Sequence, residues 1–528
     1  MIFRSSAPDV AIPNVSLPAF VLGRMARWGN KPALIDGPSG RTLSYRELAE
    51  AVQACAAGLA ARGFAKGDVL AIYSPNLPEY AVAFYAVALL GGTNTTINPL
   101  FTAEELAKQL SDAGARLLVT VGAVLDKAQA AAAQVGIEEV FTFDAVAGTT
   151  PFAALLAAGG TPPAVAIDPA QDVVALPYSS GTTGLPKGVM LTHRNLVANL
   201  LQGEAASWCR GVTEHDVVIA VMPFFHIYGM VVVMSSCLAR GGTMVTLPRY
   251  ELEAFLTSVQ RYKVTYLYVV PPIILQLAKH PSVDGYDLSS VRALFSGAAP
   301  LGEALEREVQ QRLACGSAQG YGMTEASPVT HLCPDAPGSN KPGAAGRLIP
   351  STEMMIVDVA TGEPLGPGQE GELWMRGPQF MKGYLNRPDA TAEAFHPDGW
   401  YRSGDIGYVD EDGFAYIVDR LKELIKYKGY QVAPAELEAV LVTHPEVADA
   451  AVIPSPDAEA GEVPMAFVVP RAPAQAPQPE QLMAWVAERV APYKRIRRLE
   501  YVDHIPKSPS GKILRRMLVE QERQRQAG

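Results

Sequence analysis

The stretch that decides the fold is YSSGTTGLPKG, residues 178–188, a loop rich in glycine and hydroxyl side chains. A Walker phosphate loop has the pattern GxxxxGK[ST], and its lysine opens a helix. Here Lys187 precedes Gly188 and the apolar run Val189–Leu191, which is typical of a strand. Glycine backbone N–H groups and neighbouring hydroxyls can still bind an anion. The loop therefore predicts a phosphate site that is not of the Walker type, with a flexible surface hairpin as the alternative.

The composition excludes several classes of protein. The chain has 528 residues, of which 48% are hydrophobic and 19% charged, so we expect two or more globular domains. A formal net charge of -10 argues against a nucleic-acid binder and favours small-molecule partners. The five cysteines lie far apart without CxxC spacing, and the N-terminus lacks an apolar signal core. These features predict a cytoplasmic protein without disulfides or a zinc site.

One segment is apolar enough to raise the question of a membrane span. Residues 217–239 contain no Lys, Arg, Asp or Glu, and their number would cross a bilayer. Pro223, His226, Gly229 and the serines at 235 and 236 interrupt the segment. We therefore expect a buried strand, a turn and a core helix, and no membrane span.

The pattern of apolar residues indicates an α/β fold between about residue 40 and residue 350. Helical patterns such as 44–62 and 102–112 alternate with short β-rich runs such as 69–73, 117–121 and 173–176. This alternation predicts layered α/β structure with mostly parallel strands.

After residue 350 the pattern changes to hairpins. In GYVDEDGFAYIVDR the turn Asp412–Gly413 separates two β-rich runs. A compact α+β unit follows, and we place its boundary near Arg420, which divides the chain into residues 1–419 and 420–528. The unit is predicted to contain strands at 424–427, 450–453 and 465–469 and helices at 434–443 and 479–490.

Three further segments carry groups that suit a nucleotide. QGYGMTE, residues 319–325, contains an aromatic ring, a hydroxyl and a carboxylate, which could stack a base, hold a phosphate and ligate Mg²⁺. Asp405 in YRSGD, at a predicted strand start, could accept two ribose hydroxyls. SPSGK presents Lys512 on a loop near the C-terminus. Taken singly, each residue has a structural alternative: Tyr321 in the core, Glu325 at a helix start, Asp405 in a turn and Lys512 on the surface.

Together and in this order, these segments resemble a known family. YSSGTTGLPKG, QGYGMTE, YRSGD, DRLKELIKYKGYQ and SPSGK are similar to the motifs of the adenylate-forming superfamily of acyl-CoA synthetases, luciferases and peptide-synthetase adenylation domains. The resemblance covers nearly the whole chain. It implies a large N-terminal domain of stacked α/β sheets with a barrel-like subdomain, and a small mobile α+β C-terminal domain.

The resemblance also implies a reaction in two steps. A carboxylate attacks the α-phosphate of ATP to give an acyl-adenylate and pyrophosphate, and the thiol of coenzyme A then displaces AMP. It assigns Lys512 to the bridge between carboxylate and α-phosphate, Thr324 to catalysis, Glu325 to Mg²⁺, and Asp405 with Arg420 to the ribose. The remaining ATP and AMP contacts that it implies are Ser179, Ser180, Gly181, Thr182, Thr183, Gly184, Lys187, Gln319, Gly320, Tyr321 and Gly322.

The same resemblance places the acyl substrate and coenzyme A. His226 in MPFFHIYG stands beside the acyl carboxylate, although a lone histidine in an apolar segment is more often a core residue. Lys422 is the hinge of the C-terminal domain, whose swing would bring Lys426, Gly429 and Gln431 to the coenzyme A arm. The implied acyl pocket consists of His226, Tyr228, Val232, Gly297, Ala298, Gly320, Pro328 and Val329.

Within the superfamily, SGAAPLG at 296–302 and QGYGMTEASPV at 319–329 are most similar to the 4-coumarate:CoA ligases, including bacterial cinnamate:CoA ligases. The plant members have a polar Asn-Ser pair where this chain has Val231–Val232, which makes the pocket floor more apolar. This leaves cinnamate or a medium-chain acid open beside 4-coumarate. Alternative hypotheses are a medium- or long-chain fatty acyl-CoA ligase, a luciferase-like enzyme, or a non-catalytic binding protein of the same fold. The sequence leaves the oligomeric state open.

Overall fold

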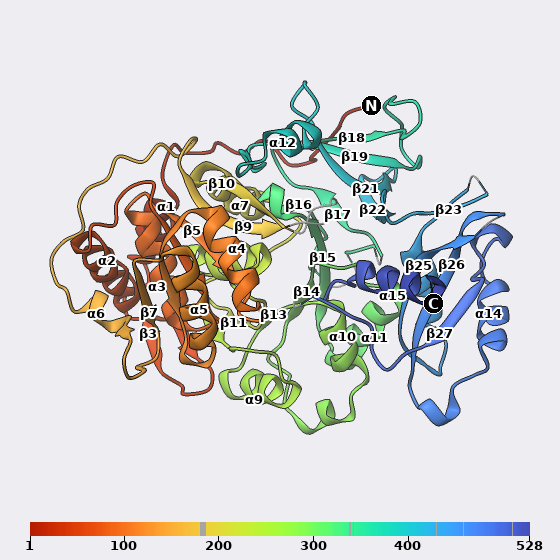
Figure 1. Cartoon of the computed structure of the whole chain (residues 1–528), viewed down its shortest axis with the longest axis horizontal. Helices are drawn as coiled ribbons and strands as arrows, with labels where there is room; N and C mark the ends of the chain where they lie inside the picture. Colours follow the sequence, from red (N-terminus) through yellow and green to blue (C-terminus); the bar gives the residue numbers. More distant parts are fainter. Residues whose placement is uncertain are drawn as a thin grey trace.

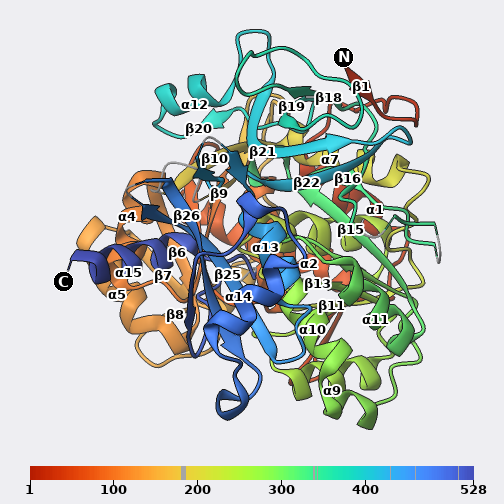
Figure 2. The same ribbon diagram turned by 90° about the vertical axis from the view of Figure 1, so that its right-hand side faces the viewer.

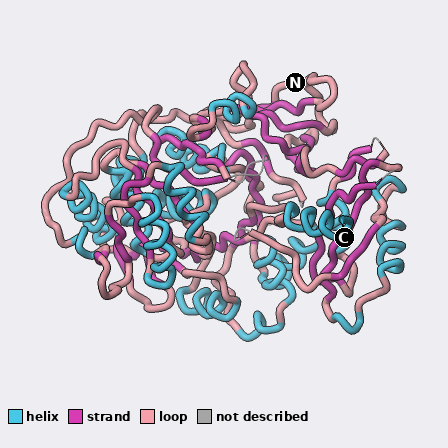
Figure 3. Tube along the Cα trace, in the orientation of Figure 1, coloured by secondary structure: helices cyan, strands magenta, loops and turns pink. Residues whose placement is uncertain are grey.

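The computed structural model describes residues 1–179, 186–336, 339–341, 343–428, 430–457, 459–508 and 511–527. Within these ranges the strands form two sheets in the N-terminal part and one in the C-terminal part. The N-terminal part, red to cyan in Figure 1, makes up most of the molecule, and the C-terminal part, in blue, stands beside it. Helices and strands alternate through most of the chain, as Figure 3 shows.

The longest sheet joins a parallel half to an antiparallel half. Strand β15 is the point of change, since it pairs parallel with β14 and antiparallel with β16. The predicted barrel-like strands are thus continuous with the parallel sheet. In order across this sheet the strands are β1 Phe3–Arg4, β18 Glu353–Val357, β19 Gly371–Arg376, β21 Tyr401–Val409, β22 Phe414–Arg420, β17 Gly346–Leu348, β16 Val329–Leu332, β15 Gly316–Gly322, β14 Ala293–Ser296, β13 Tyr266–Val269, β11 Val217–Ala220, β12 Thr243–Thr246, β2 Pro32–Asp36 and β3 Thr42–Ser44.

The second sheet carries the strand that follows the phosphate loop. Lys187 opens β10 and pairs with Ser179 at the end of β9, which confirms that the lysine leads into a strand. The parallel strands predicted from the sequence are present, and the predicted run 69–73 coincides with β4. In order the strands are β20 Gly383–Tyr384, β10 Lys187–Thr192, β9 Val173–Ser179, β5 Thr93–Ile97, β4 Val69–Tyr73, β6 Ala115–Thr120, β7 Glu139–Thr142 and β8 Thr150–Pro151.

Helices pack on both large sheets. The side chains of α3 are buried on every face apart from its ends, and α3 contacts β5 of one sheet and β2 of the other, as an apolar helix between layers must. Helices α2 and α4 confirm the predicted patterns, and each begins with a capping box. The helices of the N-terminal part are α1 Leu17–Met25, α2 Tyr45–Ala61, α3 Pro78–Leu89, α4 Ala103–Ala113, α5 Leu125–Val135, α6 Ala153–Leu156, α7 His193–Ala205, α8 Ser236–Arg240, α9 Leu252–Tyr262, α10 Pro271–Lys279, α11 Glu303–Leu313 and α12 Pro388–Ala394.

The C-terminal part has its own sheet and its own apolar core. Figure 2 faces this part, with its sheet in front of the N-terminal strands. The core begins at Ile425, just after β22 ends at Arg420. The elements are β23 Ile425–Tyr427, β24 Tyr430–Val432, α13 Pro434–Leu441, β25 Val447–Asp457, β26 Gly461–Pro470, α14 Pro479–Ala487, β27 Arg498–Tyr501 and α15 Arg515–Ala527.

The apolar segment 217–239 folds as a strand, a turn and a helix, but the first helical part is a π-helix, Tyr228–Ser235. The Ser235 hydroxyl donates to the Met230 carbonyl oxygen over 2.8 Å, which helps to satisfy the wider turn. A Cβ at Gly229 would lie 2.0 Å from the Pro223 carbonyl oxygen, so only glycine fits there. Among the residues that the structure describes, no helix is long and apolar enough to cross a membrane.

Candidate active site

A cavity of about 670 Å³ lies where the two parts of the molecule meet. The carboxyl end of β9, the turn between β15 and β16, β21, β22 and the loop before α15 all contribute to its wall. Most of the predicted site residues therefore converge on one cavity. Those that line it are Ser179, Lys187, His226, Tyr228, Val232, Gly297, Ala298, Gly320, Tyr321, Gly322, Thr324, Glu325, Pro328, Val329, Asp405, Arg420, Lys422 and Lys512.

Two predicted site residues lie elsewhere. The Gln319 side chain donates to Glu306 over 3.0 Å and accepts from the Leu301 N–H over 3.2 Å, so it stabilises the loop before α11 and not the cavity wall. Lys426 is exposed on β23 and does not line the cavity. The predicted residues that lie outside the described ranges are Ser180, Gly181, Thr182, Thr183, Gly184 and Gly429, and the side chain of Gln431 is likewise not described.

Asp405 is held in one corner of the cavity. It is the fifth residue of β21, so its predicted place at a strand start is wrong, and it pairs across the sheet with Arg420 of β22. The Arg420 Nε lies 3.2 Å from one carboxylate oxygen, and the Tyr321 hydroxyl donates to the other. The Ser403 hydroxyl accepts from the Asp405 N–H over 3.0 Å. These contacts fix the buried carboxylate of Asp405, a residue that lines the cavity.

Glu325 defines a second corner, which lies at the phosphate loop. Its Oε1 accepts hydrogen bonds from the Ser179 hydroxyl over 2.9 Å and from the Tyr384 hydroxyl over 2.8 Å. The Lys187 Nζ lies 4.9 Å from the centre of the Tyr384 ring. Sequence reasoning missed Tyr384, because its place depends on the pairing of β20 with β10 and no local motif marks it.

Lys512 reaches the cavity from the C-terminal part. The Ser508 N–H donates to the Lys512 carbonyl oxygen over 2.8 Å and closes the turn that presents the side chain. Gly511 packs against α10, and a Cβ there would lie 3.2 Å from Pro272 Cδ. Burial lowers the pKa of Lys512, and the positive charge of Arg420 lowers it further. Lys512 thus places a partly buried cation at the cavity.

His226 faces the same space. Burial lowers the pKa of His226 to about 4, with a smaller contribution from the charge of Lys512. Its Nδ1 accepts a hydrogen bond from the Tyr228 N–H over 3.3 Å, which leaves the proton on Nε2 of the neutral ring. His226 is therefore a neutral hydrogen-bond donor near the Lys512 charge.

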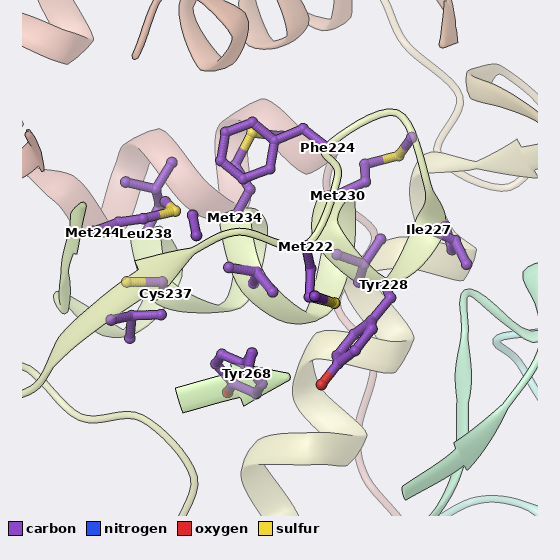
Figure 4. Close-up of a cluster of buried hydrophobic side chains, with 14 of the residues drawn as sticks. Met222, Phe224, Ile227, Tyr228, Met230, Met234, Cys237, Leu238, Met244 and Tyr268 are labelled. Atoms are coloured by element: carbon purple, nitrogen blue, oxygen red, sulfur yellow. The ribbon is translucent and has the colours of Figure 1, made fainter. Parts of the chain in front are cut away.

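Around Tyr228 the cavity is lined by Val232, Phe295, Gly297 and Ala298. Figure 4 shows Tyr228 beside Met222 and Tyr268 in a buried cluster, and the Tyr228 hydroxyl donates to the Phe295 carbonyl oxygen over 3.1 Å. A Cβ at Gly297 would lie 3.3 Å from the Tyr228 ring, so the glycine leaves room beside that ring.

The two valines at positions 231 and 232 have different environments. Val232 lines the cavity, whereas Val231 is 1% exposed and packs in the core. The floor at this point is therefore a single apolar side chain, and only Val232 of the pair can contact a ligand.

Comparisons with known proteins agree over nearly the whole chain. Residues 23–385 match the family described as AMP-binding enzyme, and residues 436–512 match the AMP-binding enzyme C-terminal domain. The chain is 46% identical to 4-coumarate–CoA ligase 5 of Oryza sativa subsp. japonica, over 98% of this chain and 96% of that protein. It is 45% identical to 4-coumarate–CoA ligase 2 of Petroselinum crispum, with the same coverage of 98% and 96%.

Two solved structures are also similar. The anthranilate CoA ligase AuaEII in complex with anthranoyl-AMP has a TM-score of 0.89 and 25% identity, over 98% of this chain and 99% of that chain. ATP-bound MatB from Rhodopseudomonas palustris has a TM-score of 0.87 and 30% identity, over 96% of this chain and 99% of that chain.

Proposed function

The chain belongs to the AMP-binding enzyme family, and we propose that it is an ATP-dependent acid:CoA ligase that acts on 4-coumarate or cinnamate. The acid would be converted to its CoA thioester through an acyl-adenylate, with release of pyrophosphate and AMP. The observation that carries this proposal is the common cavity, in which Lys512 of the C-terminal part and His226 of the N-terminal part face one space.

In the first step the enzyme must bring two anions together. The carboxylate and the α-phosphate repel each other, and a buried cation between them removes that repulsion. Lys512 supplies this charge, and the Nε2–H of His226 donates to the carboxylate. Thr324, Ser179 and Lys187 line the part of the cavity that would take the phosphates. Catalysis would thus rest on positioning and charge neutralisation.

The nucleoside would occupy the corner around Asp405. A carboxylate that borders the cavity can accept both ribose hydroxyls, while Arg420 keeps its charge balanced. The Tyr321 hydroxyl already donates to Asp405, so the ring face is the part of Tyr321 that is available to adenine.

The residues at Glu325 fit a magnesium ion. Mg²⁺ is usually held by one or two carboxylates together with substrate phosphates. Within the described ranges, no group of three or more His, Cys, Asp or Glu side chains could hold a metal ion without such help. Glu325 Oε2 receives no hydrogen bond from the described residues, and Glu325 lines the cavity beside Lys187. Bound there with the triphosphate, the ion would neutralise phosphate charge. Glu325 would hold it through Oε2.

The second step needs a different set of residues at the cavity. We propose residues 1–419 and 420–528 as the two domains, with rotation about Lys422. The rotation would withdraw Lys512 and bring in Lys426, Gly429 and Gln431 for coenzyme A. Lys512 lines the cavity, whereas Lys426 is exposed outside it, and this difference supports the division, since one conformation serves only one step.

The acyl pocket supports an aromatic acid. Gly297 and Ala298 leave a narrow space along the Tyr228 ring, and Val232 closes the floor without a polar partner for a para-hydroxyl. Such a pocket would bind cinnamate and 4-coumarate with little discrimination. A medium-chain fatty acid is the second candidate, because the same apolar floor would accept it.

We also propose that the enzyme acts in the cytoplasm. Four of its cysteines are buried thiols and Cys315 is partly buried, and none forms a disulfide. A reducing compartment suits such thiols.

Isotope transfer tests the proposed route directly. Cinnamate labelled with ¹⁸O in its carboxylate is supplied with ATP, Mg²⁺ and coenzyme A, and the AMP is examined by mass spectrometry. The acyl-adenylate route transfers one ¹⁸O atom to AMP, because the thiol cleaves the bond between the acyl carbon and that oxygen. Thioester formation with unlabelled AMP would exclude the route, and absence of any thioester would exclude cinnamate as the substrate.

A further inference from the structure

The short strand β20 connects the two segments that form the phosphate end of the cavity. The Met381 N–H donates to the Glu325 carbonyl oxygen over 2.8 Å, and the Leu385 N–H donates to the Gly188 carbonyl oxygen over 2.8 Å. Tyr384 lies between these bonds and is 6% exposed. The backbone therefore fixes the Tyr384 side chain relative to both Glu325 and β10.

The Tyr384 hydroxyl determines how Glu325 is oriented. It donates to Oε1 over 2.8 Å, and the Ser179 hydroxyl donates to the same oxygen over 2.9 Å. Both donors bind Oε1, whereas Oε2 receives no hydrogen bond from the described residues, and Glu325 lines the cavity.

The Tyr384 ring has a second partner. The Lys187 Nζ lies 4.9 Å from the ring centre, within the range of a cation–π contact. Lys187 has a long flexible side chain, and the ring limits where its ammonium group can lie. One tyrosine thus contacts both the anion and the cation at the phosphate end of the cavity.

We propose that Tyr384 is a positioning residue for ATP and its metal ion, acting through Glu325 by its hydroxyl and through Lys187 by its ring. This inference rests on the proposed function and extends it to a residue outside the motifs of the sequence. A group that orients a metal ligand commonly changes metal affinity by about 10–100-fold when it is removed.

The test uses Tyr384→Phe, which removes the hydroxyl and keeps the ring. The probe is Mn²⁺ with an α,β-methylene analogue of ATP, whose binding to the full-length enzyme is followed by EPR. We expect Tyr384→Phe to weaken Mn²⁺ binding about 10-fold. In the Glu325→Gln background the same change should have an effect below about 2-fold, because the carboxylate that it orients is absent.

A half-reaction separates positioning from a general structural effect. Thiolysis of supplied cinnamoyl-AMP by coenzyme A involves no triphosphate, and Tyr384→Phe should leave its rate unchanged. Tyr384→Leu also removes the ring, so it should in addition weaken binding of the metal-free ATP analogue. Tyr384→Phe keeps the ring and should leave that binding unchanged. Tyr250→Phe is the matched control, since the Tyr250 hydroxyl donates over 2.8 Å to Gln276 away from the cavity.

Three results would overturn the inference. These are an equal loss of Mn²⁺ affinity in both backgrounds, an equal loss of thiolysis, and the same loss in Tyr250→Phe. Failure of the proposed function would be distinguishable from failure of this inference. Even if the wild-type enzyme made no acyl-adenylate, EPR could still compare its Mn²⁺ binding with that of Tyr384→Phe.

Discussion

At the scale of single residues, burial determines the charge that each group carries. His226 and Lys512 share one cavity, and burial favours the neutral form of the histidine. The hydrogen bond from the Tyr228 N–H to Nδ1 fixes the remaining proton on Nε2. We therefore propose that the histidine acts as a hydrogen-bond donor and not as a proton-transfer group at neutral pH.

The pH dependence of His226→Ala tests this role. Because burial lowers the pKa of His226 to about 4, the ring is neutral between pH 5.5 and 7.5. Loss of a hydrogen bond to a charged group costs about 1.5–3 kcal/mol, so kcat/KM for adenylation should fall at least about 10-fold. The pH profile should keep the shape of the wild-type profile. A wild-type inflection near pH 6.5 that disappears in the variant would show that the histidine titrates during catalysis.

At the scale of elements, the turn between β15 and β16 places several site residues. The short helix Thr324–Ala326 lies in this turn, so Thr324 and Glu325 reach the cavity from one compact segment. Gly322 precedes it, and a Cβ there would lie 2.1 Å from the Pro328 carbonyl oxygen. A backbone atom cannot move aside as a flexible side chain can, so the turn requires glycine.

We predict that Gly322→Ala disrupts this turn. Overpacking of this kind costs about 1–3 kcal/mol, and displacement of Thr324 and Glu325 should raise KM for ATP more than 10-fold. Urea denaturation and steady-state kinetics measure the two effects. Gly302→Ala is the control, since a Cβ at Gly302 would meet nothing within 4 Å. Equal behaviour of the two variants would show that the close approach at Gly322 is unimportant.

At the scale of the whole molecule, two lysines of the C-terminal part have opposite environments. Lys512 is partly buried and lines the cavity, and Lys426 is exposed outside it. If the C-terminal domain turns between the two steps, each lysine serves one step alone.

Lys512→Ala and Lys426→Ala should therefore have opposite effects on the two half-reactions. Lys512→Ala should lower adenylate formation by about 10²–10³-fold, as loss of a transition-state contact does, and spare thiolysis of supplied acyl-adenylate. Lys426→Ala should spare adenylate formation and slow thiolysis. Separate assays of pyrophosphate release and of thioester formation from cinnamoyl-AMP measure the two steps. Equal losses in both steps for either variant would contradict a division between conformations.

The sequence predicted the elements whose signals are local. The run 69–73 and the strand opened by Lys187 are examples, since strand patterns depend on neighbouring residues. Features that depend on distant partners were not predictable. Asp405 takes its place from pairing with Arg420, and Tyr384 contacts a carboxylate 59 residues away.

Most of the residues that the motifs predicted line the cavity, but the side chain of Gln319 points to Glu306 and not to the cavity. A motif predicts that a segment reaches the site, whereas the direction of each side chain follows from packing that the motif does not contain.

We propose that this enzyme activates aromatic acids. The most direct test is to compare kcat/KM for CoA thioester formation from cinnamate, 4-coumarate and octanoate. The space that Gly297 leaves beside the Tyr228 ring and the apolar side chain of Val232 predict that kcat/KM for both aromatic acids exceeds that for octanoate. They also predict similar values for cinnamate and 4-coumarate, because Val232 offers no polar partner to a para-hydroxyl. A clear preference for octanoate would contradict the aromatic assignment.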